Sequence, residues 1–447
     1  MSEHSCTILV VDDEASQREL LGGFATRLGY RVREAASGEE ALESIQREPP
    51  HLVLLDVRLP GINGIETLSR IRQFAPDLPV LLITAFADLR QAVAAMKGGA
   101  EDYLAKPVDL DELRAAMADA LGVSAADHRD AGPPTPPLPA DLVCESPAMR
   151  HLVSTIAVVA PSKAPVLITG ESGTGKEVLA RLVHAWSPRA DGPLVAANCA
   201  SLPESLIESE LFGHTKGAFT GASETRQGFF RAAHGGSLFL DEIAELPLHL
   251  QPKLLRALET GQVLPVGSDR PAEVDTRLIA ATNRDLEKEV AEGRFRDDLY
   301  YRINVVELAI QPLRERREDI LPLARHFAGE FSGGPVRLSP QAGNCLLAYP
   351  WLGNIRELRN AVQRACLLSR GDVILPEHLP PKIAALASRS GTEDETHGRL
   401  SQVERATILA TLQECGGNRT QTAKKLGISR RALIYKLRAI EPESSGG

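Results

Sequence analysis

Short apolar runs alternate with helical patterns over residues 7–121 of the chain. The runs are Ile8–Val11, Leu52–Leu55, Val80–Ile83 and, less strongly, Asp102–Ala105. Near-continuous apolar strands separated by helices are typical of a parallel sheet that is buried on both faces. The pattern therefore predicts an α/β domain at the start of the chain.

A second series of the same kind follows. A strand at Pro165–Thr169 leads into the glycine-rich loop Gly170–Glu177, and Val178–Val183 continues as a helix. Further on, Ser237–Glu242 reads as a buried strand that ends in two carboxylates, and Leu278–Ala281 reads as another strand. Strand, glycine loop and helix in this order predict a phosphate-binding α/β domain.

Two breaks divide the chain. The sequence AGPPTPPLP at 131–139 cannot form a helix or a central strand, and ALASRSGTEDETHG at 385–398 is small, polar and punctuated by glycine. We expect domains at 1–125, 142–372 and 399–447, with linkers at 126–141 and 373–398.

Composition changes this picture little. A length of 447 residues suits about three domains. No apolar stretch approaches the ~20 residues of a membrane span, and Met1–Ser5 does not resemble a signal peptide, so a cytoplasmic protein is expected. The six scattered cysteines favour reduced thiols. The net charge of -9 argues against a surface that is basic throughout and binds nucleic acid, but it allows one basic domain.

Polar side chains follow the strands of the first domain. Asp12 and Asp13, then Asp56, Thr84 and Lys106, come at successive strand ends, where ligands gather on a parallel sheet. Three converging carboxylates would repel one another unless a hard cation such as Mg²⁺ lay among them. A lysine and a hydroxyl beside them can hold a phosphoryl group.

This set resembles the response-regulator receiver domain, which has a flavodoxin-like fold. The resemblance implies that Asp56 is the phosphoacceptor and that Thr84 and Lys106 contact the phosphoryl group. It also implies a Mg²⁺ site formed by Asp12, Asp13, Asp56 and the Arg58 carbonyl, a switch aromatic at Phe86, and a cis Lys106–Pro107 bond. A lone Asp is more often a helix cap, and Phe86 could equally be a core residue.

The glycine-rich loop of the second domain predicts ATP binding. Its backbone N–H groups can close around phosphates, and Lys176 can reach the β and γ oxygens. Glu177 stands where most such loops place the Ser or Thr that binds Mg²⁺, so metal binding depends more on Asp241, with Glu242 orienting the attacking water. The loop consists of Gly170, Glu171, Ser172, Gly173, Thr174, Gly175, Lys176 and Glu177.

A glycine-bounded loop lies between these motifs and is expected to move with the nucleotide. It consists of Gly217, Ala218, Phe219, Thr220, Gly221 and Ala222 (GAFTGA). The order of the motifs resembles the AAA+ domain of sigma-54-dependent activators of the NtrC family, which has a helical lid. The resemblance implies that Phe219 and Thr220 contact sigma-54. The alternative is an exposed hairpin without a partner, although an exposed Phe favours a surface to bind.

The same resemblance assigns further nucleotide-site residues. Asn198 would hold Glu242 idle, Asn283 would be sensor I, and Arg356 would be the sensor II arginine that reaches the nucleotide. Arg296 and Arg302 match arginine fingers donated to a neighbouring subunit, which implies a ring. The alternative for Arg296 is a surface ion pair with an adjacent aspartate.

The C-terminal segment is basic. Residues 416–440 hold seven Lys or Arg and no Asp or Glu, namely Arg419, Lys424, Lys425, Arg430, Arg431, Lys436 and Arg438. A helix at 418–426, a turn at Gly427–Ile428 and a second helix capped by Ser429 predict an all-α helix-turn-helix.

This segment resembles the Fis-type domain of the same family. Ser429, Arg430 and Arg431 would lie nearest the bases, and Lys436 and Arg438 nearest the phosphates. The helix at about 400–414 would form a dimer. The alternative is a solvated basic helix at a chain end.

These features together predict a two-component response regulator. A sensor histidine kinase phosphorylates Asp56, and a dimer bound to upstream DNA assembles into a hexameric ring. ATP hydrolysis in the ring then remodels sigma-54 RNA polymerase from the closed to the open complex. The alternatives are a DNA-binding repressor with a vestigial motor and an AAA+ unfoldase or chelatase subunit. The prolines at 133–139 disfavour a helical linker, so we expect phosphorylation to promote assembly.

Overall fold

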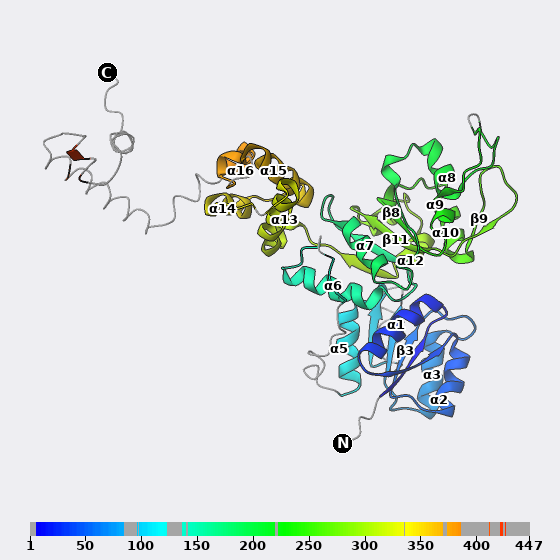
Figure 1. Cartoon of the computed structure of the whole chain (residues 1–447). Helices are drawn as coiled ribbons and strands as arrows, with labels where there is room; N and C mark the ends of the chain where they lie inside the picture. Colours follow the sequence, from blue (N-terminus) through cyan, green and yellow to red (C-terminus); the bar gives the residue numbers. More distant parts are fainter. Residues whose placement is uncertain are drawn as a thin grey trace. The chain divides into compact units, whose positions relative to one another are not determined.

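A computed structural model describes residues 6–84, 96, 98–122, 136–139, 142–219, 222–334, 336–369, 373–385, 411, 421–422 and 425. The chain separates into two compact units. The first comprises residues 1–337 and 349–373, and the second comprises residues 338–348 and 374–447. Figure 1 shows the whole chain.

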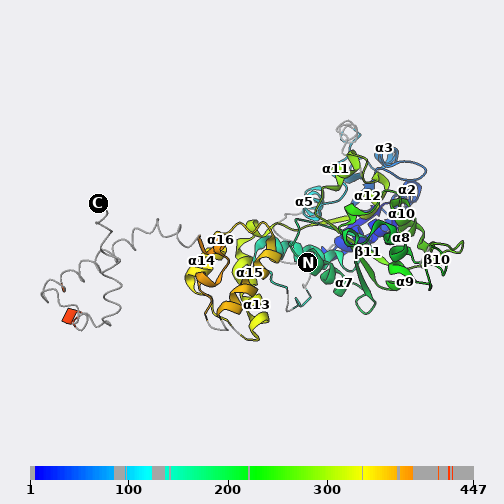
Figure 2. The ribbon, with the colours of Figure 1, turned by 90° about the horizontal axis from the view of Figure 1, so that it is seen from above.

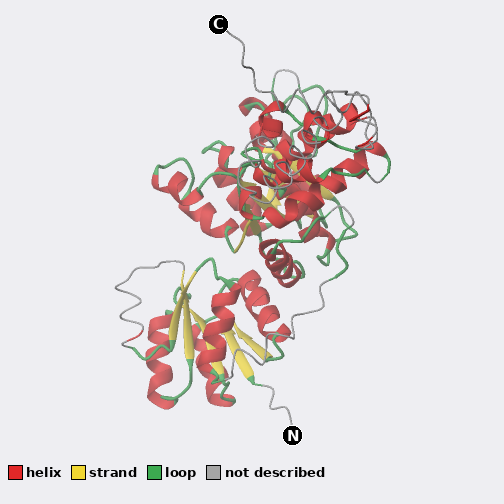
Figure 3. Ribbon diagram, turned by 90° about the vertical axis from the view of Figure 1, so that its left-hand side faces the viewer, coloured by secondary structure: helices red, strands yellow, loops and turns green. Residues whose placement is uncertain are grey.

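The N-terminal domain is a five-stranded parallel sheet in the order β2-β1-β3-β4-β5. This is the flavodoxin-like order that was predicted. Figure 3 shows its strands between helices on both sides. Its elements are β1 (Thr7–Val11), α1 (Ala15–Arg27), β2 (Arg31–Ala35), α2 (Gly38–Arg47), β3 (Leu52–Asp56), α3 (Gly64–Phe74), β4 (Val80–Thr84), β5 (Asp102–Ala105) and α5 (Leu110–Ala120).

The predicted strands form because their apolar side chains pack on both faces of the sheet. In β1, Ile8 and Val10 enter one apolar cluster, whereas Leu9 and Val11 enter another. Strand β2 was not predicted, because its sequence RVREA is mostly polar. It lies at the edge of the sheet, where only one of its sides pairs with another strand and Arg31 and Glu34 are exposed.

The second domain is built on another parallel sheet, in the order β12-β6-β11-β8-β7. The predicted strands correspond to β6, β8 and β11. The elements are α6 (Pro147–Val159), β6 (Val166–Thr169), α7 (Lys176–Ala185), β7 (Leu194–Asn198), η1 (Cys199–Ser201), α8 (Glu204–Phe212), α9 (Gly228–Ala232), β8 (Ser237–Asp241), η2 (Ile243–Glu245), α10 (Gln251–Thr260), β9 (Gln262–Val263), β10 (Ala272–Glu273), β11 (Arg277–Thr282), α11 (Leu286–Ala291), α12 (Asp297–Ile303) and β12 (Val306–Ala309).

The topology brings the chemistry to one edge of this sheet. Strand β6 lies between β12 and β11, and the glycine-rich loop leaves its carboxyl end. Strand β8 ends at Asp241 and β11 ends at Thr282, so the acids and the end of β11 lie at the same edge. Figures 1 and 2 show α8 and α9 near the antiparallel β9–β10 pair.

A helical lid follows the sheet. Within the first unit, α13 (Ile320–Ser332) packs against α15 (Asn354–Ser369), after the short helices η3 (Leu313–Glu315) and η4 (Arg317–Asp319). Within the second unit, α14 (Pro340–Ala348) contacts η5 (Pro376–His378) and α16 (Pro381–Ala384).

The expected linker at 373–398 is wrong in its first part. Ile374 pairs with Leu338, and Ile383 is buried, so residues 374–384 belong to the folded second unit. The linker was inferred from the small, polar and glycine-punctuated sequence at 385–398, and its start was placed too early. Among the described residues, no helix is long and apolar enough to cross a membrane.

Candidate functional site

The three predicted acids of the first domain converge. Carboxylate oxygens of Asp12, Asp13 and Asp56 all lie within 4.8 Å of one another. Lys106 Nζ lies 2.7 Å from Asp12 Oδ2 and 2.6 Å from Asp56 Oδ2. An all-oxygen cluster of this size suits Mg²⁺, so the residues present fit that ion.

Burial sets the electrostatics of this cluster. Burial raises the pKa of the Asp12 carboxyl, and the charge of Lys106 opposes that rise. Burial alone would lower the pKa of Lys106, but the Asp12 and Asp56 carboxylates raise it above its ordinary value. Lys106 therefore stays positively charged beside the acids, as a phosphoryl-binding group requires.

The other predicted residues of this cluster have different outcomes. Thr84 is buried at the end of β4, and its carbonyl accepts the Lys106 N–H at 2.6 Å. The Lys106–Pro107 bond is cis, as predicted. The Arg58 N–H donates to Asp56 Oδ1 at 3.0 Å, and its carbonyl as a metal ligand stays a prediction. Phe86 lies outside the described residues.

The glycine-rich loop surrounds the Lys176 side chain. Lys176 Nζ donates to the Gly170 carbonyl at 2.9 Å and to the Glu171 carbonyl at 3.4 Å, and it lies 3.7 Å from Glu242 Oε1. Only 7% of Lys176 is exposed. Glu177 instead points outward and pairs with Arg181 one turn along α7.

The lid contacts this loop directly. Both carboxylate oxygens of Glu171 accept hydrogen bonds from Arg314, at 2.6 and 2.8 Å, and Asn354 Nδ2 donates to Glu171 Oε2 at 3.0 Å. The hydrogen bonds from Arg314 have the largest effect, followed by that from Asn354, and together they lower the pKa of the Glu171 carboxyl to about 2. Arg356 Nη1 donates to Ser172 Oγ at 2.9 Å, and its contact with the nucleotide stays a prediction.

A cavity of about 480 Å³ opens between the loop and the lid. Its volume falls within the range of small-molecule sites. The cavity is lined by Glu171, Ser172, Asn283, Leu352, Gly353, Arg356, Glu357 and Asn360.

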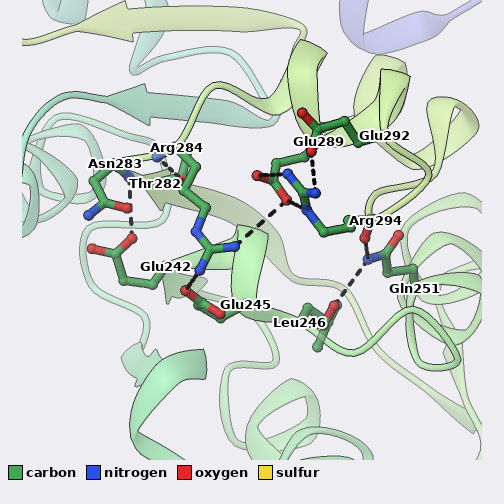
Figure 4. Close-up of polar contacts among 10 residues, drawn as sticks. All are labelled: Glu242, Glu245, Leu246, Gln251, Thr282, Asn283, Arg284, Glu289, Glu292 and Arg294. Atoms are coloured by element: carbon green, nitrogen blue, oxygen red, sulfur yellow. Dashed lines mark hydrogen bonds and ion pairs between the residues drawn. The ribbon is translucent and has the colours of Figure 1, made fainter.

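Asn198 does not contact the acid that was predicted. Its Nδ2 donates to Asp241 Oδ2 at 2.9 Å, whereas Glu242 Oε2 accepts the Asn283 backbone N–H at 3.2 Å (Figure 4). The strand register explains the difference, since Asn198 and Asp241 are directly paired on β7 and β8. Glu242 follows the strand with φ of 53°, a left-handed conformation, and turns toward β11.

The two candidate finger arginines lie on α12 and at its start. Arg296 binds Asp298 through two hydrogen bonds, at 2.9 and 2.6 Å, so the ion pair weighed as an alternative is present in the single chain. Arg302 Nη2 donates to the Leu258 carbonyl at 3.4 Å. The donation of either arginine to a neighbouring subunit stays a prediction.

The described part of GAFTGA forms a tight turn. Gly217 N–H donates to the Ala222 carbonyl at 2.8 Å, and Ala222 N–H donates to the Phe219 carbonyl at 3.0 Å. Phe219 is 38% exposed, and its ring centroid lies 5.0 Å from that of His214. Thr220 and Gly221 lie outside the described residues, as do the DNA-contact candidates Ser429, Arg430, Arg431, Lys436 and Arg438.

Sequence reasoning missed several residues at this site. Arg314 and the buried Gln251 were not singled out, although both bind segments that carry predicted site residues. Arg314 is 143 residues from Glu171, so no local spacing links them. The only signal was the charged sequence RERRED at 314–319.

Comparison with known proteins agrees with this architecture. Models of four families match: the response regulator receiver domain at 8–118, the sigma-54 interaction domain at 142–309, the AAA+ ATPase lid domain at 314–396, and the bacterial regulatory proteins of the Fis family at 399–439.

Relatives match the chain over almost its whole length. The transcriptional regulatory protein ZraR of Klebsiella oxytoca is 48% identical over 445 residues, covering 98% of this chain and 100% of the relative. The regulatory protein AtoC of Escherichia coli K12 is 45% identical and covers 96% of each chain. The crystal structure of NtrX from Brucella abortus with ADP has a TM-score of 0.52 at 36% identity, covering 98% and 99% of the two chains.

A receiver, an AAA+ domain with its lid and a Fis-type helix-turn-helix define a class of two-component transcription regulators. The chain belongs to the sigma-54-dependent response regulators of the NtrC family.

Proposed function

We propose that this protein is an activator that couples phosphorylation of Asp56 to ATP hydrolysis and thereby opens sigma-54 promoters. The observation that carries the proposal is the approach of Lys176 to Glu242, 3.7 Å apart, beside Asp241 in a chain that also has the Asp12, Asp13 and Asp56 cluster. Each half of the mechanism thus has a buried lysine, Lys106 or Lys176, beside carboxylates.

The phosphate switch needs no additional device. Shifting an equilibrium from 1:99 to 99:1 takes about 5.5 kcal/mol. One to three charge-assisted hydrogen bonds at about 1.5–3 kcal/mol each span that value. Lys106 and Thr84 supply such contacts to a phosphoryl group on Asp56, and Asp12, Asp13 and the Arg58 carbonyl hold Mg²⁺.

The ATPase acts at the loop, the acids and the lid. Lys176 binds the β and γ phosphates of ATP, Asp241 holds Mg²⁺ and Glu242 orients water, with Asn283 and Arg356 around the nucleotide. Arg296 or Arg302 of a neighbouring subunit stabilises charge on the transferred phosphoryl group, which is worth roughly 10³–10⁵ in rate. The ring, a hexamer assembled from dimers, then moves Phe219 and Thr220 against sigma-54.

The remaining steps define the partners. A sensor histidine kinase phosphorylates Asp56, and Ser429, Arg430, Arg431, Lys436 and Arg438 bind upstream DNA in the cytoplasm. A repressor with a vestigial motor needs a damaged ATPase site. The presence of Lys176, Asp241, Glu242, Arg296 and Arg302 in the sequence speaks against that alternative.

Substitution of Thr220→Ala tests the coupling. The variant is expected to hydrolyse ATP at the wild-type rate but to form no open complexes with sigma-54 polymerase on a supercoiled promoter. Continued formation of open complexes by this variant would remove GAFTGA from the mechanism.

A further inference from the structure

A buried glutamine joins two segments of the ATPase domain. Gln251, the first residue of α10, has no exposed surface. Its Nε2 donates to the Leu246 carbonyl at 3.0 Å and to the Arg294 carbonyl at 3.2 Å, and its Oε1 accepts the Arg296 N–H at 2.8 Å. Figure 4 shows the amide between Leu246 and Arg294. Both N–H groups and the oxygen of the Gln251 amide therefore have hydrogen-bond partners.

The two joined segments have different tasks in the proposed function. Leu246 follows η2, the short helix that begins directly after Glu242. Arg296 begins the segment proposed to act on a neighbouring subunit's nucleotide. An apolar residue at position 251 would leave buried backbone groups unpaired, at about 1–3 kcal/mol for each group.

Three contacts hold the backbone segment that contains Arg296. Phe295 is 2% exposed and packs in the domain core. The carbonyl before it and the N–H after it both bind Gln251. The backbone at Arg296 is thus fixed, whereas its guanidinium is exposed and hydrogen-bonded to Asp298.

Ion pairs extend this arrangement back to Glu242. Arg294 binds both carboxylate oxygens of the buried Glu289, at 2.7 and 2.9 Å, and Arg284 lies 3.7 Å from the same carboxylate (Figure 4). Arg284 also pairs with Glu245 and follows Asn283, whose N–H binds Glu242. A continuous set of contacts therefore joins the Glu242 side of the domain to the Arg296 segment.

We propose that Gln251 is a positioning residue for Arg296: its amide holds the backbone from which the guanidinium leaves Asp298 and reaches the nucleotide of the adjoining subunit. The inference rests on the proposed function, because it needs Arg296 to act between subunits. It predicts a defect that acts on the neighbour's site and leaves nucleotide binding by the same subunit intact.

The test uses the phosphorylated full-length chain and Gln251→Met, which conserves length but removes all three hydrogen bonds. We expect kcat for ATP to fall about 10²-fold, the cost of a misplacement near 1 Å, while the Kd for a fluorescent ATP analogue changes less than threefold. Gln251→Asn, which keeps an amide but is one methylene shorter, serves if the Met variant does not fold. Gln17→Met is the matched control, since Gln17 is a buried glutamine of α1; it is expected to keep the wild-type kcat.

Mixed rings separate a positioning role from a general loss of stability. Gln251→Met mixed with Lys176→Ala is expected to recover ATPase activity, because the Lys176→Ala subunit supplies an intact Arg296 to its neighbour. Gln251→Met mixed with Arg296→Ala is expected to stay inactive, because both variants lack the same contribution.

The outcomes distinguish the inference from the proposed function. Recovery with Arg296→Ala would place the Gln251 defect within its own subunit and overturn the inference, as would a wild-type kcat for both Gln251 variants. A wild-type kcat for Arg296→Ala would instead refute the proposed finger itself, and the inference would fall with it.

Discussion

The guanidinium of Arg314 holds the carboxylate of Glu171 through two hydrogen bonds, although Glu171 belongs to the phosphate-binding loop and Arg314 to the start of the lid. Asn354, with a left-handed φ of 51°, binds the same carboxylate and also the Ser172 carbonyl. Gly173, whose added Cβ would lie 2.7 Å from the Gly353 carbonyl, lets the two segments approach. The loop and the first turn of α15 therefore form one connected structure.

Loss of this ion pair is expected to loosen the lid over the nucleotide. Both side chains are at least about a third exposed, so solvent screens the pair and we expect a contribution of about 0.5–1 kcal/mol. Glu171→Gln should therefore release ADP about two- to fivefold faster, as measured by stopped-flow with a fluorescent nucleotide.

The lid itself offers a control for this experiment. Glu330→Gln removes the partner of Arg359 in an exposed ion pair of 2.9 Å between α13 and α15. This variant should release ADP at the wild-type rate. Equal release rates for the two variants would show that the Glu171–Arg314 pair does not hold the lid.

Some elements could be predicted from the sequence and others could not, and the difference has physical causes. Strands β3 and β4 were predictable because they are apolar on both faces, whereas the polar edge strand β2 has no such pattern. The acids at the strand ends were predictable because parallel strands bring their carboxyl ends together. The contact of Asn198 with Asp241 depends on the register of β7 against β8, which the motif alone does not contain.

Deletion of residues 1–135 tests how the receiver controls the ring. If the phosphorylated receiver promotes assembly, the truncated chain should show low ATPase activity at protein concentrations where the phosphorylated full-length chain is active. Sedimentation at the same concentrations should show no ring. Full constitutive activity of the truncated chain would instead mean that the unphosphorylated receiver blocks the motor.

Stability of the ATPase domain is expected to fall in mild acid because of His184. This side chain is buried on α7, its Nδ1 lies 3.0 Å from Ser237 Oγ, and burial lowers its pKa, with Arg277 nearby adding to the effect. The fold therefore favours neutral His184, whereas the unfolded chain takes up a proton near pH 6.5.

The sign of this effect follows from proton uptake. Below about pH 6.5 the unfolded state binds more protons, so the free energy of unfolding decreases as the pH falls toward the lowered pKa, by at most about 1.4 kcal/mol per pH unit. Denaturant unfolding between pH 7 and pH 5 should show a shallower pH dependence for His184→Gln than for the wild type. Parallel curves would exclude His184 as a source of this acid sensitivity.

The central claim is that a phosphoryl group on Asp56 activates a motor assembled from several subunits. The most direct measurement is ATP hydrolysis per subunit by the purified full-length chain across a range of protein concentrations, with and without a small-molecule phosphodonor and Mg²⁺. The specific activity should rise steeply with concentration for the phosphorylated wild type and stay low for Asp56→Asn. An absence of ATP hydrolysis at every concentration and in every oligomer of the phosphorylated chain would contradict the account.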